Sequence, residues 1–262
     1  MLAALIAGCA PAPAAGPREH PTFVSLNPCT DAILAQVADP AQILAISAYS
    51  HDPRASSMPP AEARRFRATG GTAEEVLALA PDTVVASPFL APATRQALAR
   101  LGIRVESVGP AATVAESERQ VRRLAALAGH PERGERLVAR IEAAWASARF
   151  AGPSVSALVW QQGGIVAGLD TLIAQALGQA GFASHAAARG LGQGAYLPLE
   201  QVLADPPRVI LAAGGDRLLA HPALRHLAGV RYERLDPALL YCGGPTIERL
   251  APRLAAIRRS VG

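Results

Sequence analysis

The sequence contains no lysine: all 25 basic residues are arginines, and they are spread along the chain. Aromatic residues make up only 4% and do not alternate with the basic ones. Proteins that bind single-stranded nucleic acids combine a basic groove with stacking aromatics, so this composition argues against a nucleic-acid partner. No apolar run reaches the ~18 residues that a membrane-spanning helix needs, and we therefore expect a soluble mature chain.

Cysteine is also scarce, and the first of the three cysteines lies in a distinctive context. Cys9 ends the short apolar run MLAALIAGCA and is followed by the Pro/Ala-rich segment PAPAAGP. Small residues before a cysteine resemble a bacterial lipobox, and the Pro/Ala segment suits an extended tether. We expect residues 1–20 to be a signal, lipobox and tether, with Cys9 lipidated and the protein periplasmic. The run is short and lacks basic residues, so a misplaced start, a signal that begins upstream or a frayed apolar N-terminus stays open.

Half of the 262 residues are hydrophobic, which is enough for one large domain or two small ones. β-Branched runs alternate with amphipathic segments, and this alternation predicts an α/β fold with parallel strands covered by helices. We expect strands near residues 22–26, 42–47, 82–86, 103–108, 154–160, 208–212 and 230–236. We expect helices near residues 30–37, 73–80, 91–101, 113–128, 131–150, 170–180, 198–204, 221–229 and 246–259.

One pattern occurs twice. TAEEVLALAPDTVVA (72–86) and PLEQVLADPPRVILA (198–212) both run from an acid through an apolar helical turn and a proline to an apolar strand. Between the copies, 131–150 has apolar residues at helical spacing over roughly 18 residues. The sequence therefore predicts two similar α/β lobes with a single long helix between them. We expect an N-terminal lobe (21–128), a bridging helix (129–152) and a C-terminal lobe (153–262).

With these features the chain resembles the helical-backbone, or class III, periplasmic substrate-binding proteins of ABC importers, of the siderophore and cobalamin type. Three stretches carry the resemblance: VSLNPCTDAILAQVADPAQILAIS (24–47), TAEEVLALAPDTVVAS (72–87) and ARGLGQGAYLPLEQVLADPPRVILAA (188–213). Each motif is loose, but their order and spacing cover about residues 22–260. The resemblance implies two Rossmann-like lobes with parallel sheets, bridged by one long α-helix, with the ligand in the cleft between them.

The resemblance also gives the repeat a meaning. Family members carry one surface acid on each lobe that pairs with arginines of the permease, and these acids correspond to Glu74 and Glu200. The implied partners are an ABC permease with its ATPase and a small-molecule metal chelate: a ferric siderophore, cobalamin or haem. The alternative is that each glutamate only favours its helix N-terminus through the helix dipole.

Ligands of open α/β sheets lie beyond the carboxyl ends of the strands, and this rule selects the candidate contacts. Four aromatics in such loops suit a large planar ligand, although each could instead cap its own core. The candidate ligand-binding residues are Asn27, Cys29, Tyr49, His51, Asp52, Thr72, Trp160, Gln161, Tyr196, Tyr241 and Cys242.

Two pairs among these residues leave alternatives open. His51 could coordinate a metal axially with Asp52 orienting its ring, but a loop histidine is more often solvated. Cys29 and Cys242 lie far apart in the sequence, each just before an expected helix. They could form a disulfide between the lobes, act as reactive or soft-metal thiols, or be two unrelated buried thiols.

An α/β enzyme is the main alternative class, and a receptor for free transition-metal ions is another. The sequence has no nucleophile elbow and no P-loop, and the glycines of Gly190-Leu-Gly192-Gln-Gly194 lack the final glycine of a dinucleotide-binding motif. A metal receptor would need three or four ligands drawn from both lobes. We therefore expect a monomeric binding protein without enzymatic activity, cofactor or resident metal, attached to the membrane only through the lipid.

Overall fold

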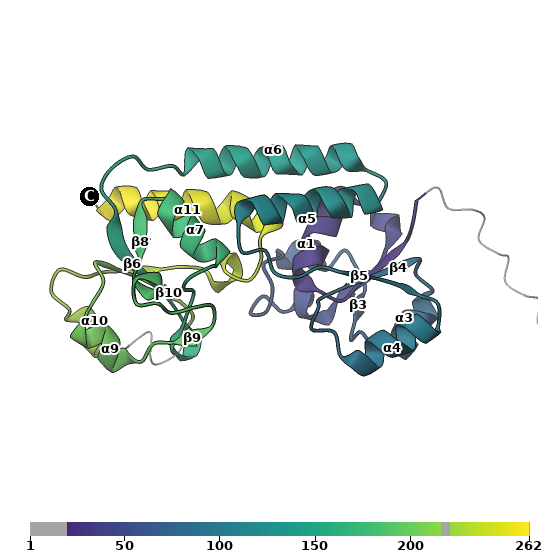
Figure 1. Ribbon diagram of the computed structural model, residues 1–262, viewed down its shortest axis with the longest axis horizontal. Coiled ribbons are helices and arrows are strands. Elements are labelled where there is room, and N and C mark those ends of the chain that lie inside the picture. Colours follow the sequence, from purple (N-terminus) through teal and green to yellow (C-terminus); the bar gives the residue numbers. More distant parts are fainter. Residues whose placement is uncertain (1–19, 216–220, 262) are drawn as a thin grey trace, which may run out of the picture.

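The computed structural model describes residues 20–215 and 221–261, which form two α/β halves (Figure 1). The first half contains a parallel five-stranded sheet with the order β3-β2-β1-β4-β5. β1, β2 and β4 are apolar and lie in the middle of this sheet, where helices cover both faces. The strands are β1 (Phe23–Ser25), β2 (Ile43–Ser47), β3 (Ala68–Thr69), β4 (Thr83–Ala86) and β5 (Arg104–Ser107).

The helices of the first half begin at polar caps. Asn27 caps the first helix, which begins two residues before the expected residue 30: the Asn27 Oδ1 accepts a hydrogen bond from the Cys29 N–H at 3.0 Å. Thr72 and Thr113 cap the third and fifth helices in the same way. The helical elements are α1 (Pro28–Val37), η1 (Pro40–Gln42), η2 (Ala48–His51), α2 (Pro60–Ala63), α3 (Ala73–Leu79), α4 (Pro92–Arg100) and α5 (Val114–Leu127).

The second half is built around a six-stranded sheet in which β10 and β6 are central. β6, β10 and β11 run parallel, as expected, and so does β8, which the sequence did not predict. The two-residue strands β7 and β9 are antiparallel to their neighbours. The strands are β6 (Val155–Gln161), β7 (Ile165–Val166), β8 (Phe182–Ser184), β9 (Ala195–Tyr196), β10 (Val209–Ala213) and β11 (Arg231–Arg234). The helical elements are η3 (Gln162–Gly164), α7 (Leu172–Gln179), α8 (His185–Ala188), α9 (Leu199–Ala204), α10 (Pro222–Arg225), η4 (Pro237–Leu239), η5 (Gly244–Thr246) and α11 (Ile247–Val261).

One long helix, α6 (Pro131–Ser147), joins the halves. It lies across both α5 and α11, which are arranged end to end beneath it (Figure 1). Leu137, Val138 and Ile141 are buried in the core of the first half, and Trp145 packs against the cores of both halves. The predicted fold of two α/β lobes bridged by a long helix is confirmed.

The lobes are less separate than the sequence suggests. The core of the first half includes Ile247 and Ala251 from α11, and η5 contacts α1 and α5. The end of the chain therefore packs on both halves, and the expected boundaries near residues 128 and 153 stay a prediction. Within the described residues, no helix is long and apolar enough to cross a bilayer.

We predict that Ile141→Ala lowers the free energy of unfolding by about 2–5 kcal/mol, because this side chain is fully buried where α6 meets the first-half core. Arg136→Ala, on the exposed face of the same helix, is the matched control and should change stability by less than about 0.5 kcal/mol. Urea unfolding followed by circular dichroism measures both. Equal losses for the two variants would show that α6 does not act as the shared core element.

Candidate ligand-binding site

A cavity of about 310 Å³ lies between the two halves. The first half contributes Cys29 at the start of α1, the loop after β5 and one residue of α5. The second half contributes the end of β6, the segment through β7 to α7, the loop before β9 and the turn before η5. Its lining is Cys29, Gly109, Pro110, Ala111, Ala112, Gln120, Gln161, Ile165, Val166, Ala167, Asp170, Thr171, Leu172, Ile173, Gln193, Gly194, Leu240, Tyr241, Cys242 and Gly243.

The first-half wall is the short loop 109–112, which side chains of α5 hold in place. The Gln120 amide donates to the Gly109 carbonyl at 2.9 Å, and Glu116 Oε2 accepts from the Ala112 N–H at 2.7 Å. These bonds satisfy backbone groups that a loop would otherwise leave to water. They also fix the loop relative to the helix, so this wall is preorganised.

The second-half wall depends on close packing of two loops. Gly168 lies so near the 191–192 backbone that an added Cβ would meet the Leu191 carbonyl oxygen at 1.7 Å. The Leu169 N–H donates to that same carbonyl at 2.7 Å. The next residue, Asp170, has a φ of 56°, and its exposed side chain lines the cavity. Asp and Asn tolerate this left-handed backbone better than other non-glycine residues, which fits a carboxylate placed there.

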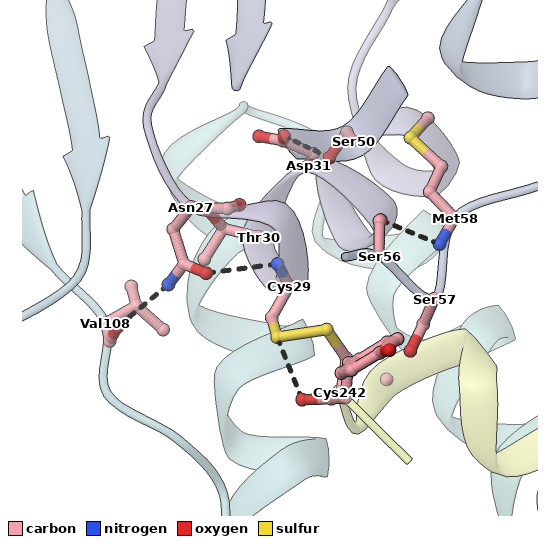
Figure 2. Close-up of a disulfide and its surroundings, with 12 residues drawn as sticks. Asn27, Cys29, Thr30, Asp31, Ser50, Ser56, Ser57, Met58, Val108 and Cys242 are labelled. Atoms are coloured by element: carbon pink, nitrogen blue, oxygen red, sulfur yellow. Dashed lines mark hydrogen bonds between the residues drawn. A yellow bond between two sulfur atoms is a disulfide. The ribbon is translucent and has the colours of Figure 1, made fainter. Parts of the chain in front are cut away.

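A disulfide between Cys29 and Cys242 forms part of the same wall and joins the two halves across 213 residues (Figure 2). Of the alternatives that the sequence leaves open for these cysteines, the structure supports the cross-lobe disulfide. Paired sulfurs are neither nucleophiles nor metal ligands, so the thiol interpretation does not apply to the oxidised protein.

Further contacts hold the 241–244 turn to the first half. The Tyr241 hydroxyl donates to the Arg54 carbonyl at 2.6 Å, and the Gly244 N–H donates to Ser117 Oγ at 2.6 Å. Next to them, Gln175 Oε1 accepts from the Val114 N–H at 2.8 Å. The halves are therefore joined by covalent and polar links at the cavity as well as by α6.

Asp31 is buried at the base of α1 and supports the loop after β2. Its Oδ2 accepts from the Ser50 hydroxyl at 2.6 Å (Figure 2). The same oxygen accepts from the Ser47 N–H at 3.0 Å, and the two bonds fix η2. Burial raises the pKa of this carboxyl to about 7, against the opposing effect of these hydrogen bonds.

The cavity contains four of the predicted ligand-binding residues: Cys29, Gln161, Tyr241 and Cys242. The prediction that Trp160 lines the cleft is wrong. Trp160 is fully buried in the second-half core, and its indole N–H donates to the Leu197 carbonyl at 3.1 Å. It lies next to last in β6, where alternation directs Gln161 to the cavity and Trp160 to the core.

Four other predicted residues do not line the cavity, and three of them have local roles. Asn27 caps α1 and donates to the Val108 carbonyl at 3.2 Å, and Thr72 caps α3. Asp52 pairs with Arg54 at 3.2 Å, and this hydrogen-bonded partner lowers the pKa of Asp52. The Nε2 of His51 is buried and has no hydrogen-bond partner within the described residues. It does not face the cavity, as an axial ligand of a bound metal would.

The last two predicted aromatics, Tyr49 and Tyr196, are exposed, with 68% and 62% of their surface accessible. Tyr49 lies in η2, directly after β2, and Tyr196 lies in β9 opposite Ile165. Phe89, in the loop after β4, is 83% exposed. Exposed aromatics in loops beside strand ends offer flat apolar surface outside the cavity itself.

The two acids of the repeat, Glu74 and Glu200, are exposed in the first turns of α3 and α9. α3 belongs to one half and α9 to the other, and both helices lie on the side of the molecule away from α6 (Figure 1). Cys9 lies outside the described residues, so the lipidation prediction cannot be placed on the fold.

Sequence reasoning missed the 109–112 loop, Gln120, Asp170 and Thr171. The rule that ligands lie beyond strand ends would have found 109–112, because this loop follows the strand expected at 103–108. Asp170 and Thr171 stand at the start of the helix expected at 170–180, where such residues are typical caps, and Thr171 does cap α7. Gln120 lies within a helix and gives no local signal.

Among residues 20–215 and 221–261, no group of three or more His, Cys, Asp or Glu side chains is arranged to hold a metal ion. The second-half histidines His185, His221 and His226 are also absent from the cavity lining. The described part of the chain therefore gives no support to a receptor for free metal ions.

Two α/β halves, a helix that bridges them and a cavity between them define a two-lobe ligand-binding protein. A family model for periplasmic binding proteins matches residues 23–235. The chain belongs to this family. No curated protein sequence matches the chain closely enough to show a relationship.

Solved structures with the same fold include haem- and vitamin B12-binding proteins. The periplasmic haem-binding protein RhuT from Roseiflexus sp. RS-1 is 24% identical, with a TM-score of 0.72 over 92% of this chain and 97% of that one. The vitamin B12-binding protein BtuF of Vibrio cholerae is 17% identical, with a TM-score of 0.73 over 92% and 98%. A periplasmic haem-binding protein from Pseudomonas aeruginosa is 22% identical, with a TM-score of 0.69 over 92% of each chain. At these identities the likeness establishes the fold.

We predict that removing the disulfide in the double variant Cys29→Ala/Cys242→Ala lowers the free energy of unfolding by about 2–5 kcal/mol, because the bond closes a loop of 213 residues. Denaturant unfolding without reductant measures the loss. Treating the wild-type protein with a reductant should produce the same shift, and the double variant should not respond to it. A reductant effect on the variant, or none on the wild type, would contradict a stabilising cross-lobe disulfide.

The buried Asp31 predicts a pH dependence. Its folded-state pKa of about 7 lies above the unfolded value near 3.8, so between these values the folded state holds a proton that the unfolded state releases. Stability contributed by this group is complete below pH ~4 and is lost as the pH rises to about 7, by about 2–4 kcal/mol.

Asp31→Asn keeps an acceptor for the Ser47 N–H and Ser50 hydroxyl and should flatten this fall between pH 4 and 8. Asp236→Asn, at an exposed position, removes the same charge and should retain the wild-type slope. Urea midpoints measured across the pH range test both variants. If the Asp31 variant keeps the wild-type slope of stability against pH, Asp31 is not the source of this pH dependence.

Proposed function

We propose that this protein captures a metal chelate in the inter-lobe cavity and delivers it to the permease of an ABC importer. The observation that carries the proposal is the cavity itself, which both halves build from loops beyond strand ends. Family membership supports a binding role in the periplasm. The solved haem- and vitamin B12-binding proteins with this fold suggest the kind of ligand.

The chemistry of the cleft supports a large organic chelate rather than a bare ion. The wall combines apolar side chains such as Ile165 and Leu172 with the amides of Gln161 and Gln193. Tyr241, 40% exposed, lies at the cavity, and Tyr49 and Tyr196 add exposed aromatic surface. Large planar or multi-ring chelates bind through such surfaces with few fixed polar contacts.

Delivery is proposed to use Glu74 and Glu200. One acid lies on each half, at the first turn of α3 or α9, and both are exposed. Two similar lobes would present these carboxylates to two permease subunits, which would contribute complementary arginines. Charge complementarity of this kind fixes register and speeds association. ATP hydrolysis on the importer's ATPase would then drive release into the membrane complex.

The cross-lobe links suggest that capture requires little closure. The disulfide and the Tyr241–Arg54 contact join the halves at the cavity, and α6 joins them along its length. We therefore propose that the site is largely preformed and that the chelate enters from the open side of the cavity. Lipidation at Cys9, which would tether the protein near its permease, belongs to the same proposal.

The double variant Glu74→Arg/Glu200→Arg tests the delivery step. Uptake by cells that depend on this protein should fall by about tenfold or more, while the Kd for the chelate stays within about twofold, because neither acid lines the cavity. Uptake of radiolabelled chelate and calorimetry on the purified protein measure the two quantities. The probe is the tightest binder in a screen of cyanocobalamin, haemin and ferrichrome.

The matched control is Glu132→Arg/Glu142→Arg, which makes the same charge change on exposed positions of α6, away from α3 and α9. The control should transport normally. Equal uptake by the wild type and both double variants would show that Glu74 and Glu200 do not dock the permease. The proposed capture of a chelate would not be affected. If no chelate in the screen binds, the proposed capture of a metal chelate is wrong.

A further inference from the structure

The cavity is almost devoid of charge although the chain is rich in arginine. Of the described residues that line it, none is an arginine or a histidine, while the whole chain has 25 arginines and a net charge of +4. Asp170 is the one carboxylate among them, and its side chain is exposed. Burial raises the pKa of the other titratable lining residue, Tyr241, so its phenol is neutral.

Within the described residues, two arginines lie beside loops of the site, and neither lines the cavity. Arg54, whose carbonyl accepts the Tyr241 hydroxyl, is paired with Asp52 through two hydrogen bonds of 3.2 Å. This pair carries no net charge. Arg95, near the loop after β4, donates to the carbonyls of Ser87 and Pro88 and does not line the cavity.

Neutral hydrogen-bonding groups take the place of charges. Gln120 projects from the first half, Gln161 and Gln193 come from the second, and Thr171 lies next to Asp170. Primary amides both donate and accept, so they match amide, hydroxamate and carbonyl groups of a ligand. They compensate an anion that loses its water shell less well than guanidinium groups do, because their hydrogen bonds carry no full positive charge.

Two unfavourable contributions to the binding free energy therefore oppose an anionic ligand in this cavity. It would lose hydration without gaining a cationic partner, and it would lie near the Asp170 carboxylate. A neutral ligand avoids both contributions, and a cation is attracted by the same carboxylate.

We propose that the site selects uncharged or cationic metal chelates with amide- or hydroxamate-type peripheries over anionic ones, and that Asp170 is the residue that sets the preference for a cation. This inference rests on the proposed capture of a chelate. It disfavours haem, with its two propionates, and catecholate siderophores, and it favours corrinoids and hydroxamate siderophores.

The test uses two series of ligands whose members differ mainly in charge. One series is ferrioxamine B, a cation, its N-acetyl derivative, which is neutral, and its N-succinyl derivative, which is an anion. The other is cyanocobalamin and a monocarboxylate made by hydrolysing one peripheral amide. Haemin and ferric enterobactin are included as anionic chelates of different shape. Isothermal titration calorimetry on the full, oxidised protein gives each Kd.

We expect the neutral or cationic member of each binding series to bind about tenfold or more tightly than its anionic counterpart, and haemin and ferric enterobactin to bind no better than those anions. Anionic members that bind as tightly as their neutral counterparts overturn the charge preference while capture of a chelate stands. If no ligand in the panel binds, the proposed function fails as well.

Asp170→Asn isolates the residue. Asparagine tolerates the left-handed backbone at this position, so the loop should keep its shape. In this variant the ratio of the two Kd values, ferrioxamine B against its acetyl derivative, should shift by about five- to tenfold toward the neutral ligand. Glu132→Gln, which removes one charge from α6 outside the cavity, should retain the wild-type preference. An unchanged preference in Asp170→Asn would rule out this residue as its source.

Discussion

Packing of one apolar helix face against both halves of the molecule is the constraint on which the ligand site depends. Leu137, Val138 and Ile141 place α6 in the first-half core, and Trp145 extends it to the second. Because a single rigid element sets the distance between the halves, loops from separate sheets can meet and form one cavity. The cross-lobe disulfide and the polar contacts of the 241–244 turn then fix the remaining freedom at the cavity.

The same arrangement explains why the two faces of the molecule differ. On the side of α6, three helices share a continuous apolar core, so that side cannot open without losing buried surface. On the other side, α3 and α9 present their first turns to solvent from separate halves. A molecule built this way keeps its lobes at a constant spacing, which suits recognition by a partner with two fixed contact points.

Much of the fold followed from local patterns in the sequence. The copies of the repeat at 72–86 and 198–212 became α3–β4 and α9–β10, within one residue of the expected bounds. These patterns are local: a cap, an apolar period and a proline. The candidate site was harder to predict, because side-chain direction depends on one residue of register. Trp160 and Gln161 are adjacent in β6, and only the second reaches the cavity. The Cys29–Cys242 pairing likewise depends on how the two sheets meet, which no local pattern specifies.

The disulfide has a topological consequence as well. Together with the backbone it closes a ring from Cys29 to Cys242 that contains every strand except β1. A protease that cuts a surface loop anywhere in this ring leaves two chains that remain covalently connected. In the oxidising surroundings where such bonds persist, a nicked molecule would keep both lobes and its cleft together, and the cut would become visible as separate fragments only after reduction.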